Sequence, residues 1–163
     1  MTYPPIRYRD DEGRVSAVLR SASAPPDLAM PSGVAVHYLA TTASTSGDFG
    51  LYRWEMAAQP TGPDPHFHRT ISESFYVLTG TVRLFDGSRW ADAEPGDFLF
   101  VPPGGIHAFR NESSEPASML LLFAPGAPRE EYFEGLARIA TEGRTLSDQE
   151  WTEFYARHDQ YMV

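Results

Sequence analysis

The chain has 163 residues, a formal net charge of −9, 42% hydrophobic residues and no cysteine, and all 13 of its basic residues are arginine. These values are typical of one globular domain with a buried core, and they argue against nucleic acid or an anionic membrane as a partner. They also exclude thiol nucleophiles, cysteine-ligated metals, Schiff-base lysines and the P-loop lysine. No apolar run approaches about 20 residues and no apolar segment opens the chain, so a cytoplasmic location is expected.

Residues 1–32 are predicted to form an N-terminal arm. They are rich in proline, serine, aspartate and arginine, and their one short apolar patch, at residues 15–19, allows a single strand at most. The sequence Ala24-Pro25-Pro26 indicates a loop, because proline restricts the backbone and cannot donate a hydrogen bond.

Residues 33–126 have an all-β pattern. Short runs rich in β-branched and aromatic residues alternate with Gly, Pro, Asp and Ser, which favours a sandwich or a barrel. Thr79-Gly80 and Asp86-Gly87 are expected to form tight turns, and the segment 102–105 a rigid loop. The expected strands are 34–39, 50–57, 74–78, 81–85, 97–101, 107–111 and 118–123.

Residues 127–163 are predicted to form a helical extension that covers one side of the barrel. Pro128 and two glutamates stand where a first helical turn favours them, and apolar residues follow at a spacing of three to four. Ser147 and Glu150 form a capping-box pattern that starts a second helix.

Four residues offer the chemistry of a metal site: His66, His68, Glu73 and His107. His66 and His68 are two residues apart, so in a strand both imidazoles lie on one face. His107 follows the Pro-Gly loop at the start of another expected strand. Three imidazoles and one carboxylate suit iron, manganese, nickel, cobalt, copper or zinc, and the residues do not select among these ions.

These residues carry a resemblance to the cupin family. The sequence His66-x-His68-x4-Glu73-x6-Gly80 is similar to the first cupin motif from its histidine onward, and Gly96-x5-Pro102-x-Gly104-x2-His107-x3-Asn111 is similar to the whole second motif. The leading glycine of the first motif departs from the pattern, because Gly62 stands two residues too close to His66 and Pro60 occupies the expected place.

The resemblance implies an all-β fold, an antiparallel double-stranded β-helix or jelly-roll barrel, with His66, His68, Glu73 and His107 as metal ligands. It implies structural roles for the other motif residues, which are Gly80, Gly96, Pro102, Gly104 and Asn111. Proteins with one copy of each motif commonly resemble homodimers whose N-terminal strands pair across subunits, so a homodimer is expected.

Among cupins the layout is most similar to quercetin-dioxygenase-like proteins. That similarity implies oxygenation of a small phenolic or enolic compound, with Glu73 both as a ligand and as the catalytic base that accepts the substrate proton. Two alternatives remain: a metal-dependent isomerase, cyclase or decarboxylase, and a module that binds a small molecule without turning it over. No nucleic-acid or membrane partner is expected in either case.

The remaining predictions concern side chains around the site. Arg53 and Glu55 alternate with Tyr52, Trp54 and Met56 on one strand and are expected to be a surface pair; the alternative is that their face lines the interior, where Arg53 would meet an anionic substrate. His37 and His158 are expected to be structural or surface residues. A dry aromatic interior is predicted from Phe75, Phe98, Phe100, Phe109, Met119 and Phe123.

Overall fold

The computed structural model describes residues 2–163, and its strands pair antiparallel throughout. The largest sheet has six strands in the order β1-β2-β3-β10-β5-β8. Their bounds are β1 Leu28–Ala29, β2 Ala35–Ala40, β3 Gly50–Met56, β10 Ala117–Ala124, β5 Ser72–Thr79 and β8 Phe98–Val101. The non-consecutive order places strands that are distant in the chain side by side, as in a jelly roll.

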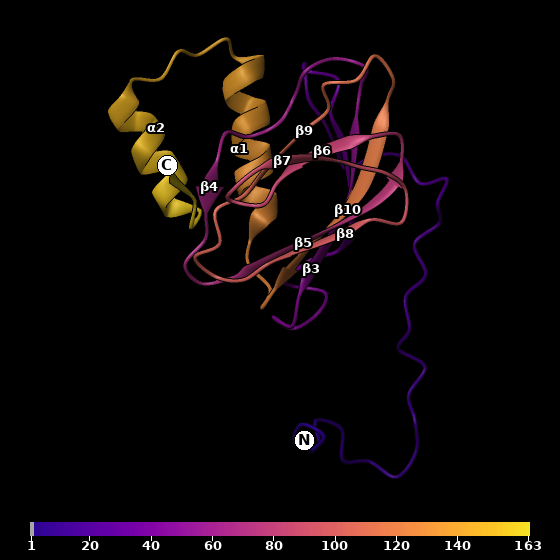
Figure 1. Cartoon of the computed structure of the whole chain (residues 1–163). Coiled ribbons are helices and arrows are strands. Elements are labelled where there is room, and N and C mark those ends of the chain that lie inside the picture. The colour runs from indigo at the N-terminus through magenta and orange to yellow at the C-terminus, as the bar shows by residue number, and fades with distance from the viewer. Residues whose placement is uncertain (1) are drawn as a thin grey trace.

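A second sheet of three strands has the order β7-β6-β9. Its strands are β7 Trp90–Ala93, β6 Val82–Phe85 and β9 Ala108–Arg110. Figure 1 shows this sheet facing the β5 and β8 side of the larger sheet across the interior of the domain. Apolar side chains from both sheets share one core. Strand β7 was not predicted, because its sequence, Trp-Ala-Asp-Ala, has only a weak strand pattern.

Strand β3 shows how the sequence selects its buried face. Tyr52, Trp54 and Met56 are buried, whereas Arg53 and Glu55 lie on the outer face. The Arg53 Nε lies 3.0 Å from Glu55 Oε1, so the prediction of a surface pair is confirmed. Strict alternation over seven residues is what a strand with one buried face requires.

Two predicted interior residues lie outside. Phe98 and Phe100 on β8 are 63% and 56% exposed, so the expectation that they line the interior was wrong. The alternating residues of β8 are Leu99 and Val101, and these side chains point inward instead. In an all-apolar strand the period of two does not reveal which face is buried, and β8 is also an edge strand.

The N-terminal residues form no helix or strand between residues 2 and 27. Val15, Val18 and Leu19 are fully or almost fully exposed, so the apolar patch of the arm does not form a strand within the chain. Figure 1 shows this segment running away from the two sheets. The division into an arm, a barrel and an extension stays a prediction.

The two predicted C-terminal helices are present as α1 Arg129–Thr141 and α2 Asp148–Arg157. The capping box of α2 is confirmed, with Ser147 and Glu150 each bonding the other's backbone N–H. A short strand beyond α2 was not predicted from the sequence. This strand, β11 Tyr161–Met162, pairs with β4, His66–Phe67, and so attaches the end of the chain to the segment that carries the histidines.

Candidate metal centre and its cavity

The structure brings the four predicted ligands together. Side-chain atoms of His66, His68, Glu73 and His107 all lie within 4.8 Å of one another, and all four residues are buried. Two backbone hydrogen bonds between His66 and His107, of 3.0 and 2.9 Å, join the segments that carry the two motifs. We call this group of four residues the His–Glu cluster.

Each imidazole of the cluster is oriented by a backbone carbonyl. The Nδ1 atoms of His66, His68 and His107 donate to the carbonyl oxygens of Asp64, Asp159 and Gly105, at 2.8, 2.6 and 3.0 Å. Because a carbonyl only accepts, the proton resides on Nδ1 and the Nε2 lone pair of a neutral ring points inward. Such outer hydrogen bonds are what fix histidine ligands in metal sites.

The donor set around Glu73 fits a cation. The Nε2 atoms of His107 and His68 lie 2.8 and 3.1 Å from the same oxygen, Glu73 Oε2. Lone pairs on two nitrogens and a carboxylate oxygen repel unless a proton or a metal ion lies between them. Nitrogen and oxygen donors of this kind match borderline divalent ions, so the cluster can hold a metal.

The protonation of the cluster follows from burial and charge. Burial, reinforced by the neighbouring His107, lowers the pKa of His66 to about 3, so this ring is neutral. Burial opposes ionisation of Glu73, but hydrogen bonds from His107 and His68 hold its pKa well below the usual range. Burial likewise opposes a charge on His107, yet its hydrogen bond to Glu73 raises the pKa of that ring. Metal binding would therefore displace a proton from the cluster.

The end of the chain supports His68 in a way that the sequence did not predict. The carboxylate of Asp159 accepts hydrogen bonds from the backbone N–H groups of Arg69 and Thr70 and from the Thr70 hydroxyl. The carbonyl of the same residue accepts from His68. Asp159 has a φ of 53°, a conformation that Asp tolerates better than most residues. No local sequence signal links positions 68 and 159.

The motif residues assigned structural roles lie in turns and loops between strands. Gly80, Gly96 and Gly104 all have positive φ values, and Gly104 N–H donates to the His68 carbonyl at 2.7 Å. Asn111 is fully buried, and its amide donates to two backbone carbonyls. The outer histidines also match expectation: His37 contacts Arg53, and His158 is the C-cap residue of α2.

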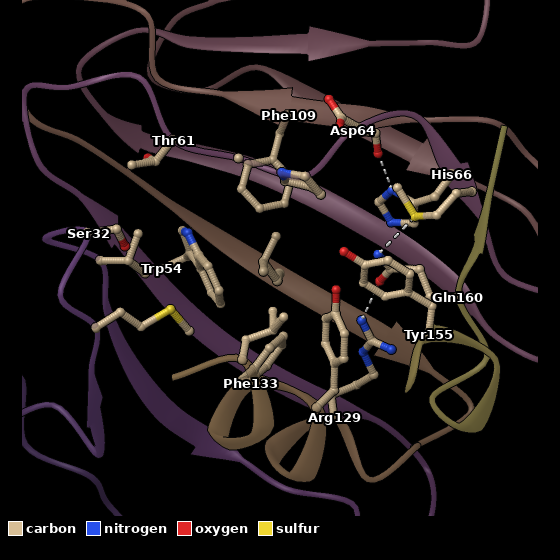
Figure 2. Close-up of a pocket in the computed structure, with 18 of the residues that line it drawn as sticks. Ser32, Trp54, Thr61, Asp64, His66, Phe109, Arg129, Phe133, Tyr155 and Gln160 are labelled. Carbon is tan, nitrogen blue, oxygen red and sulfur yellow. Dashed lines mark hydrogen bonds between the residues drawn. The ribbon is translucent and has the colours of Figure 1, made fainter. Parts of the chain in front are cut away.

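A cavity of about 430 Å³ adjoins the cluster at His66. Aromatic and aliphatic side chains form most of its wall, and Figure 2 shows them converging from β3, β9 and α1. The loop of residues 60–64, where the first motif departs from the cupin pattern, forms part of the rim. We call this space the aromatic cavity, and its apolar wall comprises Trp54, Phe109, Leu121, Tyr132, Phe133 and Leu136.

The aromatic interior was predicted only in part. Phe75, Phe109, Met119 and Phe123 are buried as expected, but of these only Phe109 contacts the aromatic cavity. Helix α1 and strand β3 supply much of the wall. Their apolar faces were visible in the sequence, but their position over the cavity depends on how the extension packs against the sheet.

Residues 52–123 match the family model described as a cupin domain. With the antiparallel sheets and the His–Glu cluster, this match identifies that part of the chain as a cupin domain. A solved structure of a predicted oxalate decarboxylase from Thermotoga maritima aligns with a TM-score of 0.59 at 19% identity, over 67% of this chain and 99% of that one. At this identity the likeness shows the fold alone.

Two curated relatives match shorter segments. An uncharacterized protein of Aquifex aeolicus is 34% identical over 65 residues, which are 40% of this chain and 53% of that protein. Quercetin 2,3-dioxygenase of Bacillus subtilis is 33% identical over 61 residues, or 37% of this chain and 18% of that enzyme. The chain therefore matches about half of one relative and less than a fifth of the other. Within residues 2–163, neither helix has the length and apolar character needed to cross a membrane.

Proposed function

We propose that the His–Glu cluster binds a divalent metal ion and that the chain is a dioxygenase acting on a small phenolic or enolic compound. The observation that carries this proposal is the convergence of three imidazoles and one carboxylate at the end of an aromatic cavity. The similarity to quercetin 2,3-dioxygenase over 61 residues supports the choice of reaction. The match covers only part of that enzyme, so its substrate is not assigned to this chain.

The chemistry depends on a few groups. His66, His68, Glu73 and His107 would hold the divalent ion, which would supply Lewis-acid chemistry to a substrate oxygen when bound. The Nδ1 hydrogen bonds hold the three imidazoles in place, so the ligand nitrogens need not reorganise. Glu73 receives the proton of the substrate hydroxyl on its carboxylate. The apolar wall, which includes Phe109 and Phe133, excludes water from the bound molecule and favours a flat ring.

The low pKa of Glu73 sets a condition on its role as a base. A carboxylate with a pKa well below the usual range is a strong ligand and a weak base. It would accept a proton efficiently only from a hydroxyl more acidic than that of a simple alcohol, such as the hydroxyl of a phenol or an enol. This requirement favours phenolic and enolic substrates over simple alcohols.

Oxygen uptake tests the proposed reaction. The protein would be stripped with a chelator, reloaded separately with iron, manganese, nickel, cobalt, copper and zinc, and assayed with flavonols and diketones in an oxygen electrode. Uptake that requires both a metal and Glu73 is expected, with Glu115→Gln as a control at an exposed acid. Turnover under strict anaerobiosis would instead assign a redox-neutral isomerase, cyclase or decarboxylase. Binding without any turnover would assign a binding module.

We also propose that the chain forms a homodimer. Tyr76, Phe98 and Phe100 place exposed aromatic rings on the two neighbouring strands β5 and β8, and β8 is an edge of the large sheet. Exposed apolar surface next to an open edge is typical of an interface between chains. Light scattering should give twice the mass of the chain, and Phe98→Ser with Phe100→Ser should shift the mass toward the monomer. A monomeric wild-type protein would contradict this proposal.

A further inference from the structure

Arg129, the first residue of α1, lies buried at the aromatic cavity. It is 4% exposed and is the one arginine that is buried among residues 2–163. Its guanidinium lies over the rings of Tyr132 and Phe123, with its central carbon 4.3 and 5.0 Å from their centroids. The aromatic faces fix the orientation of the cation, which lies on the cavity wall toward the same end as His66 (Figure 2).

The charge of Arg129 forms no salt bridge with any of the described residues. Nη1 donates to the His158 carbonyl at 2.7 Å and Nη2 donates to Gln160 Oε1 at 3.4 Å, and both acceptors are neutral. The Nε–H is buried without any acceptor. A buried cation is expected to be paired, and each buried N–H to be hydrogen-bonded. Arg129 therefore has an unused donor and a charge without a direct counterion.

Two further unpartnered polar groups line the same cavity. Within residues 2–163, four buried side-chain polar atoms lack a hydrogen-bond partner, and three of them belong to cavity residues: Trp54 Nε1, Thr61 Oγ1 and Arg129 Nε. Figure 2 shows Trp54 and Thr61 toward one end of the cavity and Arg129 and His66 toward the other. The indole and guanidinium N–H groups can only donate, so residues with an unpaired buried donor lie at both ends of the apolar wall.

We propose that Arg129 is the anion-recognition residue of this cavity and that the bound molecule is a small aromatic organic acid. Its carboxylate pairs with the Arg129 guanidinium near His66, its ring lies against the aromatic wall, and an oxygen at its far end accepts hydrogen bonds from Trp54 and Thr61. This assignment rests on the proposed function in one respect: the molecule that fills the cavity is taken to be the substrate of the His–Glu cluster.

Packing alone does not explain these groups. A residue retained only to fill space beside Phe123, Tyr132 and Phe133 would be apolar, because burying an unpaired charge is unfavourable and an apolar replacement removes that cost. The two acceptors that Arg129 contacts are neutral, and the carboxylates that stabilise its charge, those of Glu73 and Asp159, act on it without a direct hydrogen bond. An arriving carboxylate supplies a charge-assisted hydrogen bond, and Arg presents its donors in a planar fork that suits such a group.

Calorimetry with paired probes tests this assignment on the full chain. The probes are 4-hydroxycinnamate and its neutral carboxamide, which differ in charge at one end only. We expect the carboxylate to bind at least about tenfold more tightly than the amide, as a charge-assisted hydrogen bond implies. Arg129→Gln should reduce this preference to nearly none. Arg138→Gln, at an exposed position on the same helix, should leave it unchanged.

Repeating the titrations after chelator treatment separates this assignment from the proposed function. A carboxylate preference that survives metal removal and disappears in Arg129→Gln supports Arg129 even if the chain proves not to be a dioxygenase. A preference that disappears with the metal but persists in Arg129→Gln means that the metal holds the carboxylate, and it overturns the assignment while the proposed function stands. Equal affinity of both probes for the wild-type chain also overturns it.

Two measurements remain decisive if Arg129→Gln does not fold. Thr61→Val keeps the shape of the side chain and should weaken 4-hydroxycinnamate about fivefold while leaving cinnamate, which lacks the far hydroxyl, unaffected. A crystal structure of the wild-type complex should place the carboxylate within hydrogen-bond distance of Arg129 Nε. A carboxylate bound elsewhere, or equal effects of Thr61→Val on both probes, would contradict the proposal.

Discussion

His68 and Asp159 are 91 residues apart in the chain, yet the Nδ1 of His68 donates to the carbonyl oxygen of Asp159 at 2.6 Å. One residue of the C-terminal extension thereby orients a residue of the His–Glu cluster. The pairing of β11 with β4 holds this arrangement together, since it aligns Met162 with His66 and Tyr161 with Phe67. The extension is thus part of the candidate metal centre as well as a cover for the sheet.

Asp159→Ala should weaken metal binding by about 10- to 100-fold, the range seen when an outer partner of a metal ligand is lost. The carboxylate holds the Arg69 and Thr70 backbone N–H groups, and without it the segment that carries His68 loses its anchor. Competition with a chromophoric chelator would measure the affinity. Asp159→Asn keeps a hydrogen-bond acceptor and tolerates the positive φ, so it should lose much less metal affinity than Asp159→Ala. Equal affinity of wild type and Asp159→Ala would refute the positioning role.

Gly62→Ala should destabilise the protein by about 2–4 kcal/mol. Gly62 has a φ of 148°, and a Cβ added there would lie 1.9 Å from the Phe109 carbonyl oxygen. The loop that borders the aromatic cavity would have to move away from β9. Gly13→Ala is the matched control, because nothing lies within 4 Å of a Cβ at that position. Urea unfolding measures both, and identical midpoints would show that the close approach is unimportant.

Asn111→Ala should cost about 2–4 kcal/mol of unfolding free energy, because it empties a fully buried position and removes the side-chain hydrogen bonds to two backbone carbonyls. The Asn111 amide donates to the carbonyls of Ala57 and Glu115 at 2.8 and 2.9 Å, and its oxygen accepts from Ser113. Ser113→Ala removes one of these partners and should cost less. If Asn111→Ala lost less unfolding free energy than Ser113→Ala, the structural role given to Asn111 would be contradicted.

The metal-free protein should lose stability in acid, beginning below about pH 6.5. Burial lowers the pKa of His66 from 6.5 to about 3, so between these values the unfolded chain binds a proton here that the native chain does not. Glu73, whose native pKa is below its ordinary 4.5, adds a loss in the same direction at lower pH. The pKa of His107 is raised in the native state, so protonation of this ring stabilises the fold at low pH. That stabilisation is lost as the pH rises above 6.5.

Urea unfolding of chelator-treated protein at about pH 7, 5.5 and 4.5 would measure this dependence, since these values span the window in which the unfolded His66 titrates. His66→Gln, which cannot titrate, should show a smaller decrease across this range than the wild type. His37→Gln changes a buried histidine outside the cluster and serves as the comparison. Unfolding free energies of wild type and His66→Gln that fall in parallel would show that His66 does not cause the loss.

The fold and the ligand set could be predicted because both depend on local patterns. The alternation along β3 is a property of neighbouring residues, and the resemblance of the two motifs to the cupin family marked His66, His68, Glu73 and His107, which the structure brings together. The inward face of β8 could not be predicted, because its four residues are all apolar. The roles of Asp159 and Arg129 depend on the packing of the extension against β4 and β3, and no spacing rule encodes such a contact.

Metal content tests the central claim most directly. Inductively coupled plasma emission spectroscopy would measure the metal content of the wild type, His66→Ala and Glu73→Ala. His37→Ala, at a buried histidine outside the cluster, is the control. Circular dichroism would confirm that each variant is folded. The wild type and His37→Ala should each hold about one divalent ion per chain. His66→Ala and Glu73→Ala should hold much less after dialysis. Retention of metal by both cluster variants, or a wild type that binds none when reloaded, would contradict the account.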